Sequence, residues 1–106
     1  MLEGKRIIVT GSARGMGEAT LNAYVQAGAN VVGMDVSDDA GRSISEKANK
    51  TGPGKCSYIH VDVSDKTSVE QSFSKALEIL GGLDVLAHPA AIQRASDASN
   101  VSVEDW

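Results

Sequence analysis

The chain contains 106 residues, of which 42% are hydrophobic and 23% are charged, and it carries a formal net charge of −4. This composition is typical of a single globular domain and argues against disorder. The basic residues are scattered, which argues against nucleic acid as the main partner. No apolar run approaches the length of a membrane span and no signal peptide is evident, so we expect a cytoplasmic protein without a membrane partner.

Strands and helices are predicted to alternate along the chain. The four predicted strands are short and largely apolar, and they span residues 5–10, 30–35, 56–61 and 83–87. The three predicted helices cover residues 15–27, the stretch from a cap at Ser37 or Asp38 to the break at 51–54, and residues 66–80 after a cap at Ser64. Such alternation predicts an α/β fold with parallel strands and right-handed crossovers.

Each predicted helix carries apolar side chains at helical spacing, and we expect these side chains to face the sheet. In the first helix they are Ala19, Ala23, Tyr24 and Ala27. In the second helix they are Ala40, Ile44 and Ala48. In the third helix they are Val69, Phe73, Ala76, Leu77 and Leu80.

A glycine-rich segment, residues 10–17, joins the first strand to the first helix. Its glycines, Gly11, Gly15 and Gly17, suit a loop that turns sharply and lets the backbone approach a phosphate. We expect the backbone amides near Ser12, Met16 and Gly17 to face a pyrophosphate, assisted by the positive end of the helix.

Three side chains of this loop have separate expectations. The Met16 side chain is expected to pack inward, so that only its amide serves the site. The side chains of Ser12 and Arg14 either contact phosphate or ribose or are solvated.

An acidic residue, Asp35, ends the second predicted strand, 18 residues after Gly17. An acid near this distance can accept hydrogen bonds from the hydroxyl pair of a ribose. The alternative interpretation of Asp35 is a helix cap or a turn residue. Together, the loop and the acid predict a dinucleotide site.

The sequence resembles the short-chain dehydrogenase/reductase family in three features: the spacing of the glycines in the loop at 10–17, the acid Asp35, and the Leu-Asp-Val-Leu segment at 83–86. The resemblance covers all 106 residues. It implies one domain over residues 1–106, forming the first half of a Rossmann-type doubly wound parallel sheet with strand order 3-2-1-4. It also implies that the loop binds the cofactor, that Asp35 holds the adenosine ribose, and that Asp62 and Val63 lie along the adenine ring.

The residues around Asp35 bear on the choice of cofactor. A carboxylate there binds the two free hydroxyls of NAD and repels the 2′-phosphate of NADP. The next residues are Val36, Ser37 and Asp38, so no arginine follows to hold that phosphate. Arg14 points the other way, since the resemblance implies that a basic residue in this loop can favour NADP in family members that lack the acid. We therefore expect NAD rather than NADP.

The segment after the fourth strand departs from the family pattern. Where the family has Asn-Asn-Ala-Gly, this chain has His88-Pro89-Ala90-Ala91, and Pro89 lacks a backbone donor. His88 and Ala90 are the remaining candidates for cofactor contact in this segment. The alternative interpretation of His88 is an ordinary loop residue.

No catalytic residue of the family is predicted in this chain. The family reaction needs a serine and a tyrosine followed four residues later by a lysine. The only tyrosines are Tyr24 and Tyr58, and residues 28 and 62 are not lysine. No metal site is expected either, because His60 and His88 fall on strands that are three spacings, or about 14 Å, apart in the implied order.

The end of the chain resembles the start of another helix, since Ser102 is followed three residues later by Asp105. We interpret this pattern as the point where the sequence has been cut from a longer protein; the alternative interpretation is a frayed coil at the end of the chain.

The leading hypothesis is an NAD-preferring oxidoreductase that transfers hydride between nicotinamide and a hydroxyl or carbonyl compound. This chain would supply the dinucleotide-binding half, and a small-molecule alcohol or carbonyl substrate is expected only if the missing half is present. The alternative is a non-catalytic nucleotide-binding or assembly module, in which the uncovered edge of the fourth strand supports a homo-oligomer. A methyltransferase is a third hypothesis, which the spacing of the glycine loop disfavours.

Overall fold

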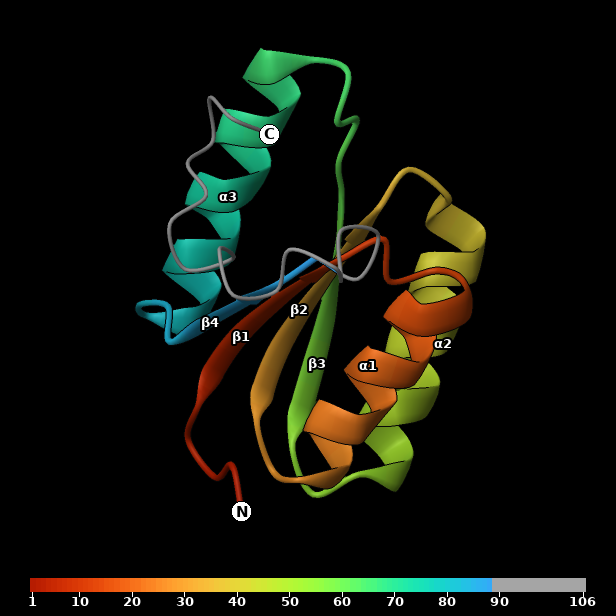
Figure 1. Ribbon diagram of the computed structural model, residues 1–106, viewed down its shortest axis with the longest axis vertical. Coiled ribbons are helices and arrows are strands. Elements are labelled where there is room, and N and C mark those ends of the chain that lie inside the picture. The colour runs from red at the N-terminus through yellow and green to blue at the C-terminus, as the bar shows by residue number, and fades with distance from the viewer. Residues whose placement is uncertain (89–106) are drawn as a thin grey trace.

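The computed structural model describes residues 1–88 (Figure 1). The predictions for Pro89 and Ala90 and for residues 102–105 lie outside the described residues. Strands and helices alternate as predicted, in the order β1 (Arg6–Thr10), α1 (Gly15–Gln26), β2 (Asn30–Asp35), α2 (Asp38–Thr51), β3 (Lys55–His60), α3 (Lys66–Leu80) and β4 (Val85–Ala87).

The four strands form one parallel sheet in the order β3-β2-β1-β4. The predicted fold class and strand order are thereby confirmed. Figure 1 shows α1 and α2 on one face of the sheet and α3 on the other. All four strands point the same way, so their carboxyl ends meet at one edge of the sheet.

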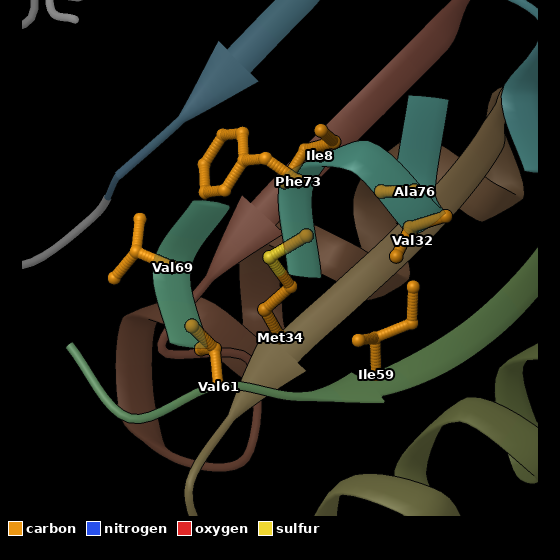
Figure 2. Packing of buried hydrophobic residues seen from close by; sticks show 8 residues of the cluster. All are labelled: Ile8, Val32, Met34, Ile59, Val61, Val69, Phe73 and Ala76. Atoms are coloured by element: carbon orange, nitrogen blue, oxygen red, sulfur yellow. The ribbon is translucent and has the colours of Figure 1, made fainter. Parts of the chain in front are cut away.

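The apolar core lies on both faces of the sheet because neighbouring strand residues point to opposite faces. Ile8 faces α3, whereas Ile7 and Val9 face α1 and α2. The cluster beneath α3 is shown in Figure 2 and contains Ile8, Val32, Met34, Ile59, Val61, Val69, Phe73 and Ala76. The cluster beneath α1 and α2 contains Ile7, Val9, Leu21, Val25, Ala29, Val31 and Ala48.

The buried face of α1 differs from the prediction. Ala19 and Ala23 are exposed, and the buried residues of the helix are Gly17, Leu21 and Val25. Leucine and valine bury more apolar area than alanine, so the helix turns these larger side chains towards the sheet.

The faces of α2 and α3 also differ in part from the prediction. Ala48 is buried and Ile44 is half-buried, but Ala40 is exposed and Gly41 lies buried next to it. In α3 the expected residues are buried or half-buried except Leu77, which is 40% exposed at the edge of the apolar stripe.

The amino-terminal cap of α3 is Asp65, not Ser64. The Asp65 carboxylate accepts hydrogen bonds from the amides of Thr67 and Ser68 at 3.0 and 3.4 Å. The Ser64 hydroxyl instead donates to Asp62 at 2.6 Å. The predicted cap was therefore one residue too early, because two adjacent residues both have side chains suited to capping.

Candidate nucleotide-binding site

The candidate site lies at the edge where the carboxyl ends of the parallel strands meet (Figure 1). The β1–α1 loop, Asp35 at the end of β2, Asp62 after β3 and His88 after β4 all belong to this edge. In open α/β sheets this edge is where ligands bind. Within residues 1–88, no helix is both long enough and apolar enough to cross a bilayer.

The three glycines of the β1–α1 loop have two different tasks. Gly11 and Gly15 have φ angles of 67° and 50°, in the left-handed region that favours glycine. A Cβ atom at either position would meet no atom within 4 Å, so the backbone is open to a ligand there. A Cβ atom at Gly17 would overlap the carbonyl oxygen of Gly11, so Gly17 lets the start of α1 pack against the loop.

The backbone amides of the loop are only partly free to meet a phosphate. The Ser12 amide donates to the carbonyl of Met34 at 3.1 Å, and the Gly17 amide donates to the carbonyl of Arg14 at 3.0 Å. For the Met16 amide, no acceptor is found within the described residues. Because Met16 stands in the first turn of α1, its amide also lies at the positive end of the helix dipole.

Two side chains of the loop differ from expectation. Met16 is 50% exposed, so the prediction that its side chain packs inward is wrong. The Ser12 side chain is buried rather than solvated, and its hydroxyl has no hydrogen-bond partner among residues 1–88. A Cβ atom added at Gly33 would lie 2.7 Å from this hydroxyl, so Ser12 is directed at β2.

The Asp35 carboxylate is buried and is held by three backbone amides. One oxygen accepts from the amide of Ala13 at 3.0 Å. The other oxygen accepts from the amides of Val36 and Ser37 at 2.6 and 3.1 Å. This arrangement ties the carboxylate to the β1–α1 loop on one side and to the turn before α2 on the other. Asp35 is thus a turn residue, as the alternative interpretation of the sequence had it, and its carboxylate also faces the glycine loop.

Arg14 lies beside Asp35, with its guanidinium Nη2 4.0 Å from Asp35 Oδ1. The Arg14 side chain is 75% exposed, whereas that of Asp35 is 3% exposed. An ion pair at this distance with one exposed partner contributes little to stability. The arginine is therefore available to reach a ligand bound along the loop.

The end of β3 places polar and apolar groups beside the end of β2. The Asp62 carboxylate accepts hydrogen bonds from the hydroxyl and the amide of Ser64, and these bonds lower the pKa of Asp62. Val63 is 55% exposed and Val36 is 53% exposed, and the two residues follow adjacent strands. Two exposed apolar side chains at the ends of neighbouring strands suit a planar ring. Sequence reasoning missed Val36, although it directly follows the acid of the motif.

Tyr58 is a second residue to which the sequence analysis gave no part in the site, because no lysine follows it four residues later. Its ring belongs to β3, and its hydroxyl lies 2.6 Å from the carbonyl oxygen of Asp35 and 2.7 Å from Asp38 Oδ1. His60 Nδ1 lies 2.7 Å from the same oxygen of Asp38. No local sequence pattern indicates this contact, because it joins β3 to the start of α2.

His88 is joined to the end of β1. Its Nδ1 lies within hydrogen-bond distance of the Thr10 hydroxyl, and burial lowers the pKa of His88. His60 stands on β3 and His88 follows β4, and these are the two outer strands of the sheet. No group of His, Cys, Asp and Glu side chains that could hold a metal ion is found among residues 1–88.

Comparison with known proteins supports the family resemblance. The chain matches the short chain dehydrogenase family over residues 5–106. It is 33% identical over 105 residues to 3beta-hydroxysteroid dehydrogenase 1 of Eggerthella lenta, covering 99% of this chain and 40% of that protein. It is 33% identical over 104 residues to meso-2,3-butanediol dehydrogenase of Serratia marcescens, covering 98% of this chain and 40% of that protein. The chain thus spans about 40% of the length of these curated relatives.

Solved structures share the fold as well. An alcohol dehydrogenase from the archaeon Thermococcus sibiricus, complexed with 5-hydroxy-NADP, superposes with a TM-score of 0.75 at 33% identity over 77% of this chain and 35% of that chain. A short chain dehydrogenase from Mycobacterium smegmatis superposes with a TM-score of 0.78 at 28% identity over 82% of this chain and 36% of that chain. The sequence matches and the shared parallel sheet confirm the resemblance: the chain belongs to the short-chain dehydrogenase family.

Proposed function

We propose that this chain binds NAD in preference to NADP and forms the dinucleotide-binding half of an oxidoreductase. The observation that carries the proposal is the Asp35 carboxylate, which three amides hold beside the glycine loop. A carboxylate held in this way can accept hydrogen bonds from the free ribose hydroxyls of NAD. It would repel the 2′-phosphate of NADP.

The remaining contacts follow the same edge of the sheet. The open backbone at Gly11 and Gly15 and the amide of Met16 would receive the pyrophosphate, with Arg14 beside it. Val36 and Val63 would flank the adenine ring, next to Asp62. We assign the region of His88 and Ala90 to the nicotinamide side of the cofactor.

The proposed reaction of the whole protein is hydride transfer between nicotinamide and a hydroxyl or carbonyl carbon. Its support is that the relatives include dehydrogenases whose names specify a hydroxysteroid, a butanediol and a hydroxycyclohexanecarboxylate. Neither Tyr24 nor Tyr58 is followed four residues later by lysine, so we assign to these 106 residues the binding of the cofactor and not proton transfer to the substrate.

Direct titration of the chain with NAD, NADP and ADP tests the cofactor proposal. We expect NAD to bind more tightly than NADP, and ADP to bind about as tightly as NAD, because the proposed contacts are to the adenosine diphosphate end. The alcohol dehydrogenase structure containing 5-hydroxy-NADP makes NADP the competitor that matters. Tighter binding of NADP than of NAD would refute the proposed preference.

A matched pair of variants locates the preference. Asp35→Asn removes the charge beside the loop, and we expect the preference for NAD over NADP to fall by about tenfold. Asp39→Asn removes the same charge from an exposed position in the first turn of α2, and we expect it to leave the preference unchanged. An equal effect of both variants would show that net charge, and not the position of Asp35, sets the preference.

The proposal of a homo-oligomer is separate from cofactor binding. Its support is the outer position of β4 in the sheet, where Leu83 and Val85 are each 38% exposed. Sedimentation of the chain over a range of concentrations tests it, and a monomer at every concentration would contradict it.

A further inference from the structure

The Tyr58 side chain links three elements of the sheet edge. Its hydroxyl lies 2.6 Å from the main-chain oxygen of Asp35 at the end of β2, and 2.7 Å from the carboxylate of Asp38 at the start of α2. The hydroxyl has one proton, which it shares between these two acceptors. Tyr58 therefore holds both ends of the short turn that separates β2 from α2.

The packing around the Tyr58 ring is specific. Gly41 of α2 faces the ring, and a Cβ atom at Gly41 would overlap the ring carbons. The guanidinium carbon of Arg42 lies 6.0 Å from the ring centroid. A residue larger than glycine at position 41 would push α2 away from β3. The glycine thus allows the hydroxyl to reach the turn.

The charges around the hydroxyl keep it a donor. Burial raises the pKa of Tyr58, and the nearby carboxylates of Asp38 and Asp35 raise it further, so the hydroxyl retains its proton at neutral pH. Hydrogen bonds from Tyr58 and His60 lower the pKa of Asp38, so Asp38 is charged. The bond between Tyr58 and Asp38 is therefore a charge-assisted hydrogen bond, which is stronger than a neutral one.

The turn that Tyr58 holds also carries the donors of the Asp35 carboxylate. The amides of Val36 and Ser37 both bind Asp35 Oδ1, and Asp38 follows directly. The main-chain oxygen of Asp35 has a second donor, the amide of Val61. Within the described chain, Tyr58 and His60 are the two β3 residues that bind Asp38. Loss of the Tyr58 hydroxyl would remove one of the two β3 side chains that hold Asp38 and would thereby loosen the start of α2 and the two amides that orient the carboxylate.

We propose that Tyr58 is a positioning residue for Asp35, and that its hydroxyl sets how strongly the site prefers NAD to NADP. The inference rests on the proposed function, since it assumes that the Asp35 carboxylate receives the ribose. Tyr58 would act through the turn at 36–37, because its hydroxyl is bonded to Asp35 and Asp38 on either side of that turn. Neither the family resemblance nor the glycine motif assigns it this role.

The test compares Tyr58→Phe with Tyr24→Phe. Both variants remove one phenol hydroxyl from a half-buried ring, and the Tyr24 hydroxyl has no hydrogen bond within residues 1–88. Two properties are measured: the hydrogen-exchange rates of the Val36 and Ser37 amides without nucleotide, and the dissociation constants for NAD and NADP. For Tyr58→Phe we expect exchange at both amides to accelerate about tenfold and the preference for NAD to fall about fivefold. For Tyr24→Phe we expect neither change.

The two measurements separate this inference from the proposed function. An unchanged ratio of NAD to NADP affinity in Tyr58→Phe overturns the inference, even when both affinities fall together. A wild-type chain without a preference for NAD overturns the proposed function and the selectivity assigned to Tyr58, while the exchange rates still decide whether Tyr58 holds the turn. Asp38→Asn is the second variant, and a smaller change in the same direction is expected because it keeps an oxygen acceptor. No change of exchange or ratio in Asp38→Asn counts against the inference.

Discussion

Arg6 and Asp84 bind each other through both their side chains and their backbones. Arg6 Nε and Nη2 donate to the two oxygens of Asp84, each at 3.0 Å. The Arg6 amide also donates to Asp84 Oδ2, and the Asp84 amide donates to the carbonyl of Arg6. These bonds fix the residue before β4 against the first residue of β1. They explain why β4 begins at Val85, two residues later than the sequence predicted.

The Arg6–Asp84 pair predicts a loss of stability in acid. The Arg6 guanidinium lowers the pKa of Asp84 from 3.8 to about 2. A carboxyl group with a lower pKa in the folded state stabilises the fold above its unfolded pKa and loses this contribution as the pH falls towards 2. We expect Asp84→Asn to be less stable than wild type at pH 7 and to lack the decline between pH 4 and 2 that this group causes. Urea unfolding across that range measures it, and Asp39→Asn serves as the control. Parallel declines in wild type and Asp84→Asn would count against the pair.

The cap of α3 gives a second prediction. Asp65 accepts two amide hydrogen bonds at the start of the helix, whereas Ser64 binds the side chain of Asp62. Removal of a capping side chain costs about 1 kcal/mol. We expect Asp65→Ala to lower the free energy of unfolding by about that amount and Ser64→Ala to lower it by clearly less. Chemical denaturation of both variants provides the comparison, and an equal loss would restore Ser64 as the cap.

Local patterns were sufficient to predict the elements but not every buried face. The bounds of β2 and α3 agree with the prediction, because Gly28 lies two residues before β2 and because Asp65 and Gly81 flank α3. The buried face of α1 was predicted from the positions of alanines, but alanine is small enough to occur on the buried face and on the exposed face of a helix. Leu21 and Val25 settle the orientation because they bury more apolar area than Ala19 and Ala23.

In the candidate site, too, local features could be predicted from the sequence, whereas contacts between distant residues could not. The place of the glycine loop between β1 and α1, and that of Asp35 at the end of β2, could be predicted because both depend on local sequence signals. The contact of Tyr58 with Asp38 was not predicted, because the two residues meet only when β3 packs against α2. The role of Gly41 was not predicted either, because the local sequence does not show that the Tyr58 ring packs against this glycine.

His88 gives a prediction for mildly acidic pH. Burial lowers the pKa of His88 below 6.5, so the folded state binds a proton less readily than the unfolded state. The free energy of unfolding should therefore fall as the pH drops from 6.5 towards the pKa of the folded state. We expect His88→Asn to remove this part of the decline, and His60→Asn to leave it in place. Unfolding measured between pH 5 and 8 tests the prediction, and NMR titration of the His88 ring gives the pKa directly. A ring that titrates at or above 6.5 would refute it.

Substitution by alanine is expected to lower the free energy of unfolding by different amounts at Gly17 and at Gly15. At Gly15 the φ angle is 50° and the space is open, so alanine meets only backbone strain of about 1 kcal/mol. At Gly17 the methyl group would overlap the carbonyl of Gly11, which is backbone and cannot swing aside. We expect Gly17→Ala to lower the free energy of unfolding by about 3 kcal/mol and to weaken ADP binding at least tenfold, because the start of α1 must move from the loop. Denaturation and ADP titration of both variants measure the difference. If Gly17→Ala lowers the free energy of unfolding no more than Gly15→Ala does, the start of α1 can shift against the loop without cost. The close packing at Gly17 would then not fix the position of the Met16 amide, and the proposed phosphate contact would lose this support.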